Sequence, residues 1–167
     1  RSNSHHTYND NINEKFKKIN FKSLLKVYSK IFKLFFDNEF KASKPFKYTY
    51  SIENATAMGK DQYMNSHCHL PSSFSCVHYL KINENNSGIT FKNPNNLSEA
   101  MQWIAPKSYD ILNKIDTSNS YFFPTFNLKP KQDTMLIFPS TLHHAVERQI
   151  DSKNLRISVA TNITLDE

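Results

Sequence analysis

After Pro45, the sequence divides into short segments in which apolar or aromatic residues alternate with polar ones. A period of two is typical of β-strands that bury one face. Turn-forming residues separate the segments, and we expect one such run, Asn83–Gly88, to be a hairpin-type connection. Many short strands favour a sandwich or barrel over a parallel α/β sheet. The expected strands are Phe46–Glu53, Gln62–His69, Ser75–Ile82, Ile89–Lys92, Tyr121–Asn127, Thr134–Phe138, His144–Gln149 and Leu155–Ile163.

The segment before Pro45 has a helical pattern instead. Residues 11–38 carry lysines at helical spacing opposite an apolar stripe, and we expect that stripe to pack against the sheet. Asn20 either interrupts this helix or caps its second half. Residues 1–10 are polar and are predicted to be flexible. The stripe consists of Leu24, Leu25, Tyr28, Ile31, Phe32, Phe35 and Phe36.

Composition excludes several classes of protein. The 167 residues suggest one domain, with strands from 46 to 163 as its core. Only 2 Gly are present, so a glycine-rich phosphate loop is not available. No apolar run approaches a membrane span. Cys68 and Cys76 form no disulfide framework and suit a reducing compartment, so we predict a cytoplasmic protein.

The net charge is +6, and much of the excess positive charge comes from the lysines of the predicted helix near the start of the sequence. We expect these lysines to be the solvated face of that helix. The alternative is a surface for nucleic acid or another anionic partner, which is possible but not favoured because no aromatic–basic RNA-binding motif accompanies the charge.

Two histidine signals about 75 residues apart carry the chemistry. Alternate residues of a strand point to one face, so His67 and His69 can project together. A third imidazole from a distant strand would complete a metal site, because imidazole binds iron, zinc, copper and nickel. The pair His143-His144 follows a Phe-Pro-Ser turn, and only one member can face inward. The alternation does not decide between them, and His78 remains either a pocket residue or a packed one.

Arg156 and Ser158 share one face of the last predicted strand. A buried arginine needs an anionic partner, since an unpaired buried charge is very unfavourable. A carboxylate ligand would meet that need by a bidentate contact, and Tyr79, Thr90 or Tyr63 could add hydrogen bonds to the same acid. An internal salt bridge or a surface position is the simpler alternative.

With these residues in order, the chain resembles the 2-oxoglutarate- and Fe(II)-dependent oxygenase superfamily. It looks most like the bacterial and phage branch related to prolyl hydroxylases. The resemblance covers residues 58–163, and the segments that carry it are His67–Ser73, Ser75–Leu80, Gly88–Pro94, Phe138–Val146 and Arg156–Asn162.

The resemblance implies a double-stranded β-helix, or jelly roll, with helices packed outside. It implies that His67 and His144 bind Fe(II), with His144 chosen over His143 by register, and that Arg156, with Ser158 beside it, binds 2-oxoglutarate. The usual second ligand is Asp or Glu two residues after the first histidine, and His69 stands there instead. Asp61 and Glu147 are other carboxylates, but neither has the right spacing.

We therefore predict a 2-oxoglutarate/Fe(II)-dependent dioxygenase, a hydroxylase, with metal ligands His67, His69 and His144 and cofactor contacts from Arg156, Ser158 and Tyr79. Its substrate is a small molecule or a peptide of unknown identity. One alternative is a cupin-like enzyme that binds metal through three histidines, as catalytic zinc sites do, without 2-oxoglutarate. The other is a non-catalytic jelly roll that binds a partner through the basic helix. Trp103 and Tyr109, in the insertion 93–120 with its short helix at Leu97–Ile104, are candidates for the pocket entrance.

Overall fold

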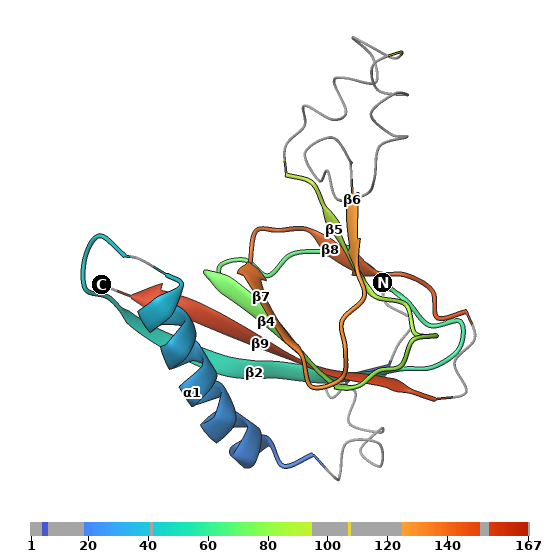
Figure 1. The fold of residues 1–167 in the computed structure, drawn as a ribbon, viewed down its shortest axis with the longest axis horizontal. Helices are drawn as coiled ribbons and strands as arrows, with labels where there is room; N and C mark the ends of the chain where they lie inside the picture. The colour runs from blue at the N-terminus through green and yellow to red at the C-terminus, as the bar shows by residue number, and fades with distance from the viewer. Residues whose placement is uncertain are drawn as a thin grey trace.

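The computed structural model describes residues 5–6, 19–40, 42–94, 107, 125–150 and 154–166. Within these residues, one long helix, α1, packs on the outer face of the larger of two facing antiparallel sheets (Figure 1). No helix among the described residues is both long and apolar enough to cross a membrane. The predictions for residues 11–18, the short helix at 97–104, Trp103 and Tyr109 lie outside the described residues.

Helix α1 runs over Phe21–Asn38 and begins at the predicted cap. The side chain of Asn20 accepts a hydrogen bond from the backbone N–H of Ser23 at 3.0 Å, which satisfies one of the free donors of the first turn. Tyr28, Phe32 and Phe36 follow at intervals of four and are buried on one face. The lysines of the opposite face are exposed, as predicted, and they are Lys22, Lys26, Lys30 and Lys33.

The larger sheet has five strands in the order β1-β2-β9-β4-β7. Strand β2 (Lys47–Met58) pairs along its length with β9 (Arg156–Asp166), and β9 pairs in turn with β4 (Phe74–Lys81). Strand β7 (Met135–Pro139) forms one edge. At the other edge, β1 (His5–His6) pairs with Thr56 and Ala57 of β2, so this part of the predicted flexible N-terminus is a strand.

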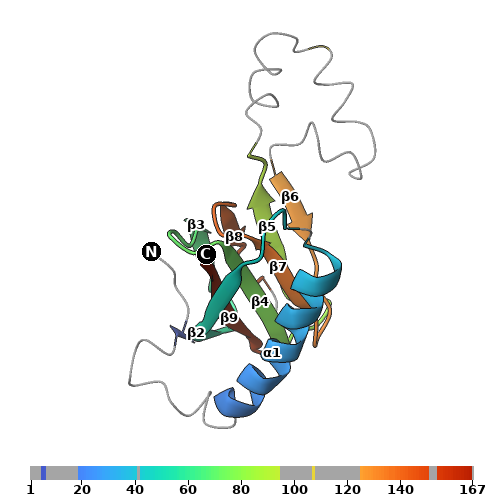
Figure 2. The ribbon, with the colours of Figure 1, turned by 90° about the vertical axis from the view of Figure 1, so that its left-hand side faces the viewer.

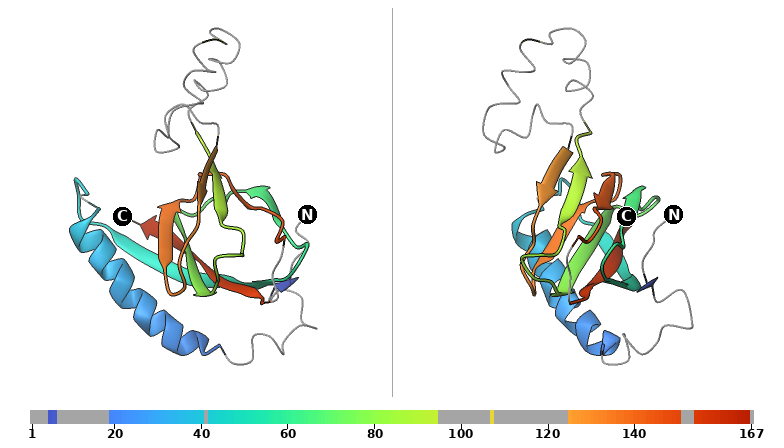
Figure 3. Two further views of the ribbon diagram at one scale, coloured as in Figure 1. Left: turned by 45° about the vertical axis from the view of Figure 1, so that its right-hand side comes forward. Right: turned by 90° about the vertical axis from the view of Figure 1, so that its right-hand side faces the viewer.

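The smaller sheet has four strands in the order β3-β8-β5-β6. They are β3 (Met64–His67), β8 (His144–Val146), β5 (Ile89–Lys92) and β6 (Thr125–Leu128). Figures 2 and 3 show this sheet facing the larger one, on the side away from α1. Two facing antiparallel sheets with a helix outside confirm the predicted jelly-roll architecture.

The prediction of a hairpin at Asn83–Gly88 is wrong. Strand β4, before this turn, pairs with β7 and β9, whereas β5, after it, pairs with β6 and β8. The turn therefore carries the chain from one sheet to the other. Turn-forming residues mark where a strand ends, but they do not determine which strand becomes its neighbour.

The two faces of the larger sheet have different roles. Its outer face packs on α1 through Ala55, Cys76, Val159 and Ile163. Its inner face faces the smaller sheet and carries polar residues at the alternate positions of the same strands. These inner residues are Asn54, Thr56, Ser75, Tyr79, Arg156 and Ser158.

Candidate metal and cosubstrate site

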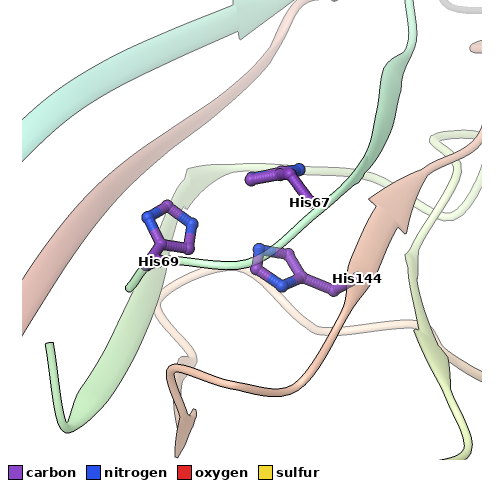
Figure 4. A group of neighbouring side chains, drawn as sticks. All are labelled: His67, His69 and His144. Carbon is purple, nitrogen blue, oxygen red and sulfur yellow. The ribbon is translucent and has the colours of Figure 1, made fainter. Parts of the chain in front are cut away.

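Three imidazoles meet between the two sheets. The ligand atoms of His67, His69 and His144 all lie within 4.8 Å of one another. Figure 4 shows the three rings gathered around a common point, with His67 and His144 coming from different strands. Among the described residues, this trio is the group of His, Cys, Asp and Glu side chains placed to hold a metal ion.

Strand register brings the first and last of these histidines together. His67, at the end of β3, pairs directly with His144, at the start of β8. Side chains of directly paired residues lie on the same face, and the two ring centroids are 4.4 Å apart. His143 is exposed and adjacent, so the choice of His144 agrees with the strand geometry.

His69 reaches the site from outside a strand. Strand β3 ends at His67, so the expectation that His67 and His69 alternate along one strand is wrong. A backbone hydrogen bond instead holds the segment after β3, because the N–H of His69 donates to the carbonyl of buried Ser140 at 2.9 Å. The His69 ring lies nearly parallel to that of His144, with centroids 5.2 Å apart.

Backbone carbonyls fix the tautomers of two rings. The Nδ1 atom of His67 lies 2.8 Å from the carbonyl of Asn65, and that of His144 lies 2.9 Å from the carbonyl of Leu142. A carbonyl oxygen can only accept, so each Nδ1 must carry the proton. Each Nε2 therefore presents a free lone pair, as a metal ligand requires.

Burial favours the neutral form of two of the site histidines. It lowers the pKa of His144 to about 4, although the carbonyl of Leu142 raises that pKa and the neighbouring histidines lower it further. Phe138, with its ring centroid 4.9 Å from that of His144, contributes to these apolar surroundings. Burial also lowers the pKa of His69, with a further lowering from His67 and a smaller opposing effect from Glu53. Neutral imidazole is the form that binds metal.

A buried arginine shares the cavity with the histidines. Arg156 is 2% exposed, and together with Ser158 it lines the same pocket of about 40 Å³ as the three histidines. Its Nη1 donates to the Oγ of Ser158 at 3.3 Å and to the Sδ of Met58 at 3.5 Å. Its guanidinium carbon lies 5.0 Å from the centroid of the Tyr79 ring. The described residues provide no salt bridge to this guanidinium.

Two buried polar atoms, one on the arginine and one on the neighbouring tyrosine, lack a hydrogen-bond partner within the described structure. The Nε of Arg156 and the Oη of Tyr79 are both buried without a hydrogen bond. Burial raises the pKa of Tyr79, against the opposing effect of the guanidinium, so its hydroxyl remains a donor. A buried cation with unsatisfied donors around it fits a bound anion. The donor set therefore suits a metal and an acidic ligand, and the residue types fit Fe(II) and 2-oxoglutarate.

The other candidates from the sequence lie elsewhere. His78 faces α1, where its Nδ1 lies 2.9 Å from the Oη of Tyr28. Asp61 pairs with Arg148 at 3.1 Å, and Glu147 accepts a hydrogen bond from Thr90, so neither carboxylate belongs to the trio. Tyr63 is exposed and does not line the pocket.

Solved structures with similar folds include an oxidoreductase of the 2OG-Fe(II) oxygenase family from Burkholderia pseudomallei. It is 12% identical with a TM-score of 0.51, and the alignment covers 81% of this chain and 57% of that one. A Pseudomonas putida prolyl-4-hydroxylase is 11% identical, with a TM-score of 0.46 and coverages of 86% and 64%. HygX from Streptomyces hygroscopicus, solved with nickel and 2-oxoglutarate bound, is 10% identical, with a TM-score of 0.43 and coverages of 74% and 57%. This chain thus spans less than two thirds of each of these proteins.

No curated protein matches the sequence. The family model described as "Putative 2OG-Fe(II) oxygenase" matches residues 55–162, which is well over half of the chain and contains every predicted site residue. The description names the two cofactors that the sequence predicts, Fe(II) and 2-oxoglutarate. The resemblance is therefore confirmed, and the chain belongs to this family of 2OG-Fe(II) oxygenases.

Proposed function

We propose that this protein is a 2-oxoglutarate- and Fe(II)-dependent dioxygenase that hydroxylates a small-molecule or peptide substrate. The observation that supports this most is the position of Arg156, a buried cation without an acidic partner in the described structure, in one cavity with three imidazoles. A metal ion accounts for the three imidazoles, and a dianionic cosubstrate accounts for the buried guanidinium. The metal alone would leave the guanidinium unpaired, and an anion alone would leave the three imidazoles without a role.

Each residue has a task in this proposal. His67, His69 and His144 would hold the iron, and Arg156 with Ser158 would hold the carboxylate of 2-oxoglutarate that lies farther from the metal. The hydroxyl of Tyr79 has an unused donor for the same carboxylate. Val77, Ile89 and Val146 line the cavity and limit the water that reaches it.

The bound iron supplies the redox chemistry that couples dioxygen to oxidation of 2-oxoglutarate and substrate. In the overall reaction, one oxygen atom enters the substrate C–H bond as hydroxyl. The other enters succinate as 2-oxoglutarate loses carbon dioxide. The chain's own residues would contribute by positioning both reactants and by gathering three imidazoles that can hold the metal.

The donor set also favours a second candidate, a three-histidine metalloenzyme that does not use 2-oxoglutarate, because three imidazoles are typical of catalytic zinc sites. That candidate gives the buried guanidinium of Arg156 no role. Metal analysis of protein purified without added metal separates the two proposals. Stoichiometric zinc, together with no effect of 2-oxoglutarate on thermal stability, would favour the second.

Succinate formation tests the leading proposal. The wild-type protein, supplied with Fe(II), oxygen and 2-oxoglutarate, should form succinate even without its substrate, at a slow uncoupled rate. His144→Ala removes a metal ligand and should reduce that rate to background, whereas His143→Ala, next to it but exposed, should not. Absence of both succinate formation and 2-oxoglutarate binding in the wild type would remove the proposal.

A further inference from the structure

A second cavity, of about 430 Å³, lies at the other end of strand β4 from the metal site. Ile82 of this cavity follows the last residue of β4, whereas Ser75, near the first residue, contacts Ser140 beside His69. Among the described residues, no side chain lines both this cavity and the one with the histidines. Its lining comes from the turn after β4 and from the connection between β6 and β7, and consists of Ile82, Asn83, Glu84, Asn86, Lys129, Pro130, Lys131 and Gln132.

Backbone contacts hold the two walls of this second cavity in place. At the end of the β6–β7 connection, the N–H of Asp133 donates to the carbonyl of Tyr79 on β4 at 2.8 Å. The walls also approach each other closely at Gly88, where a Cβ atom would lie 2.1 Å from the carbonyl oxygen of Leu128. The second cavity is therefore formed by the fold itself.

One buried donor at this cavity has no partner. Asn86 is 4% exposed, and its Oδ1 accepts a hydrogen bond from the backbone N–H of Asn83 at 3.0 Å. That bond identifies the oxygen of the amide, so its other terminal atom is the Nδ2 donor. This Nδ2 is buried without a hydrogen bond in the described structure. Buried donors nearly always have a partner, and a ligand with acceptor oxygens would supply one.

The charges around the cavity favour an anion. Lys129 and Lys131 are exposed cations on one wall, and Glu84 is the one acid among the described lining residues. Within the described part of the chain, no ion pair joins either lysine to an acid. A phosphate group carries nearly two negative charges at pH 7 and three strong acceptor oxygens, so it can use both cations and an amide donor together.

We propose that this cavity binds the phosphate group of a small phosphorylated compound, with Nδ2 of Asn86 and the ammonium groups of Lys129 and Lys131 as donors. A volume of about 430 Å³ is typical of small-molecule sites and leaves room for the rest of such a compound. The site is separate from the metal and cosubstrate site, so it stands whether or not the proposed function does.

An NMR titration of the full, ¹⁵N-labelled chain with glycerol 3-phosphate tests this inference. The side-chain amide signal of Asn86 and the backbone signals of residues 83–86 and 129–132 should shift and reach saturation. Inorganic phosphate, in a parallel titration at the same ionic strength, should shift the same signals with lower affinity, because it leaves part of the cavity unfilled. Equal affinity for the two compounds would overturn the assignment to a phosphorylated compound in favour of free phosphate.

Four variants separate this site from a general attraction of anions to a basic protein. Asn86→Asp keeps the acceptor for the N–H of Asn83 but replaces Nδ2 with a carboxylate oxygen, so the affinity should fall by at least about 10-fold. Lys131→Met should lower the affinity by about two- to fivefold, and Glu84→Gln should raise it by a similar factor. Lys26→Met, on the exposed face of α1, is the matched control and should bind as the wild type does.

The guanidinium of Arg156 also attracts anions, so it needs its own control. Arg156→Met should leave the shifts at residues 83–86 and 129–132 unchanged, because this residue does not line the second cavity. Three results overturn the inference: loss of those shifts in Arg156→Met, equal affinities in the wild type and Asn86→Asp, or no saturable shift at these residues in the wild type. Because the titration uses neither metal nor 2-oxoglutarate, its failure is distinguishable from a failure of the proposed function.

Discussion

Arg156 is an unfavourable residue for this fold to bury. Its guanidinium is removed from water, and burial lowers its pKa, with Tyr79 acting in the opposite direction. The contacts to Ser158, Met58 and the Tyr79 ring are those of neutral groups. An unpaired buried ion destabilises a protein by several kcal/mol. A fold that retains such a group has a use for it, and binding an anionic cosubstrate is that use in our account.

Protonation of His144 is unfavourable in the folded state, so the free energy of unfolding depends on pH. Its pKa is about 4 when folded and near the usual 6.5 when unfolded. The unfolded state therefore takes up a proton first as the pH falls. The contribution of His144 to the free energy of unfolding is therefore fully present above about pH 6.5 and is lost as the pH falls from there toward about 4.

We expect His144 to account for a loss of about 2 kcal/mol in the free energy of unfolding of the metal-free protein between pH 7 and pH 5. Urea denaturation at several pH values measures this loss. His144→Gln replaces the imidazole with a side chain that does not titrate, so its stability should fall less over the same interval. Equal slopes for the two proteins would contradict the assignment of a lowered pKa to this residue.

At the scale of elements, the periodic pattern of the sequence predicted where the strands and the helix lie, but it did not predict how the strands pair. The alternating pattern located strands β2 to β9, and the apolar stripe located α1 with its cap at Asn20. The bulge at Glu53 and the change of sheet after β4 were not predicted. Both depend on which strands pair, and pairing is decided by contacts between distant segments rather than by local pattern.

The helix is attached to the sheet by its aromatic face. Phe32 is fully buried between α1 and the sheet, and its ring centroid lies 5.0 Å from that of Tyr50 on β2. Leu34, two residues later, is 60% exposed. The helix therefore depends on one face for its contribution to stability.

Phe32→Ala should destabilise the protein by about 3–5 kcal/mol, because it leaves a cavity in the core. Leu34→Ala changes an exposed position on the same helix and should alter stability by about 0.5 kcal/mol or less. Chemical denaturation of both variants measures the difference. Similar losses for the two would show that α1 does not pack on the sheet through this face.

At the scale of the whole molecule, two facing sheets assemble a site from segments far apart in the sequence. The residue types predicted His67 and His69 as a pair with a third histidine from a distant strand, and the family resemblance selected His144 over His143. The sequence did not indicate the bulge at Glu53, because the bulge depends on how β2 pairs with β9. It also could not show that Arg156 and the histidines share one cavity, since this follows from the way the sheets face each other.

The measurement that tests the central claim most directly is binding of 2-oxoglutarate to the Fe(II)-loaded protein without oxygen, by calorimetry. The wild type should bind, and Arg156→Met should lose at least about 30-fold in affinity, as expected when one partner of a buried charge pair is removed. The variant should still unfold cooperatively and bind Fe(II). Arg148→Met, at the exposed arginine paired with Asp61, should bind 2-oxoglutarate as the wild type does. Equal 2-oxoglutarate affinity in the wild type and Arg156→Met, or none in either, would contradict the account.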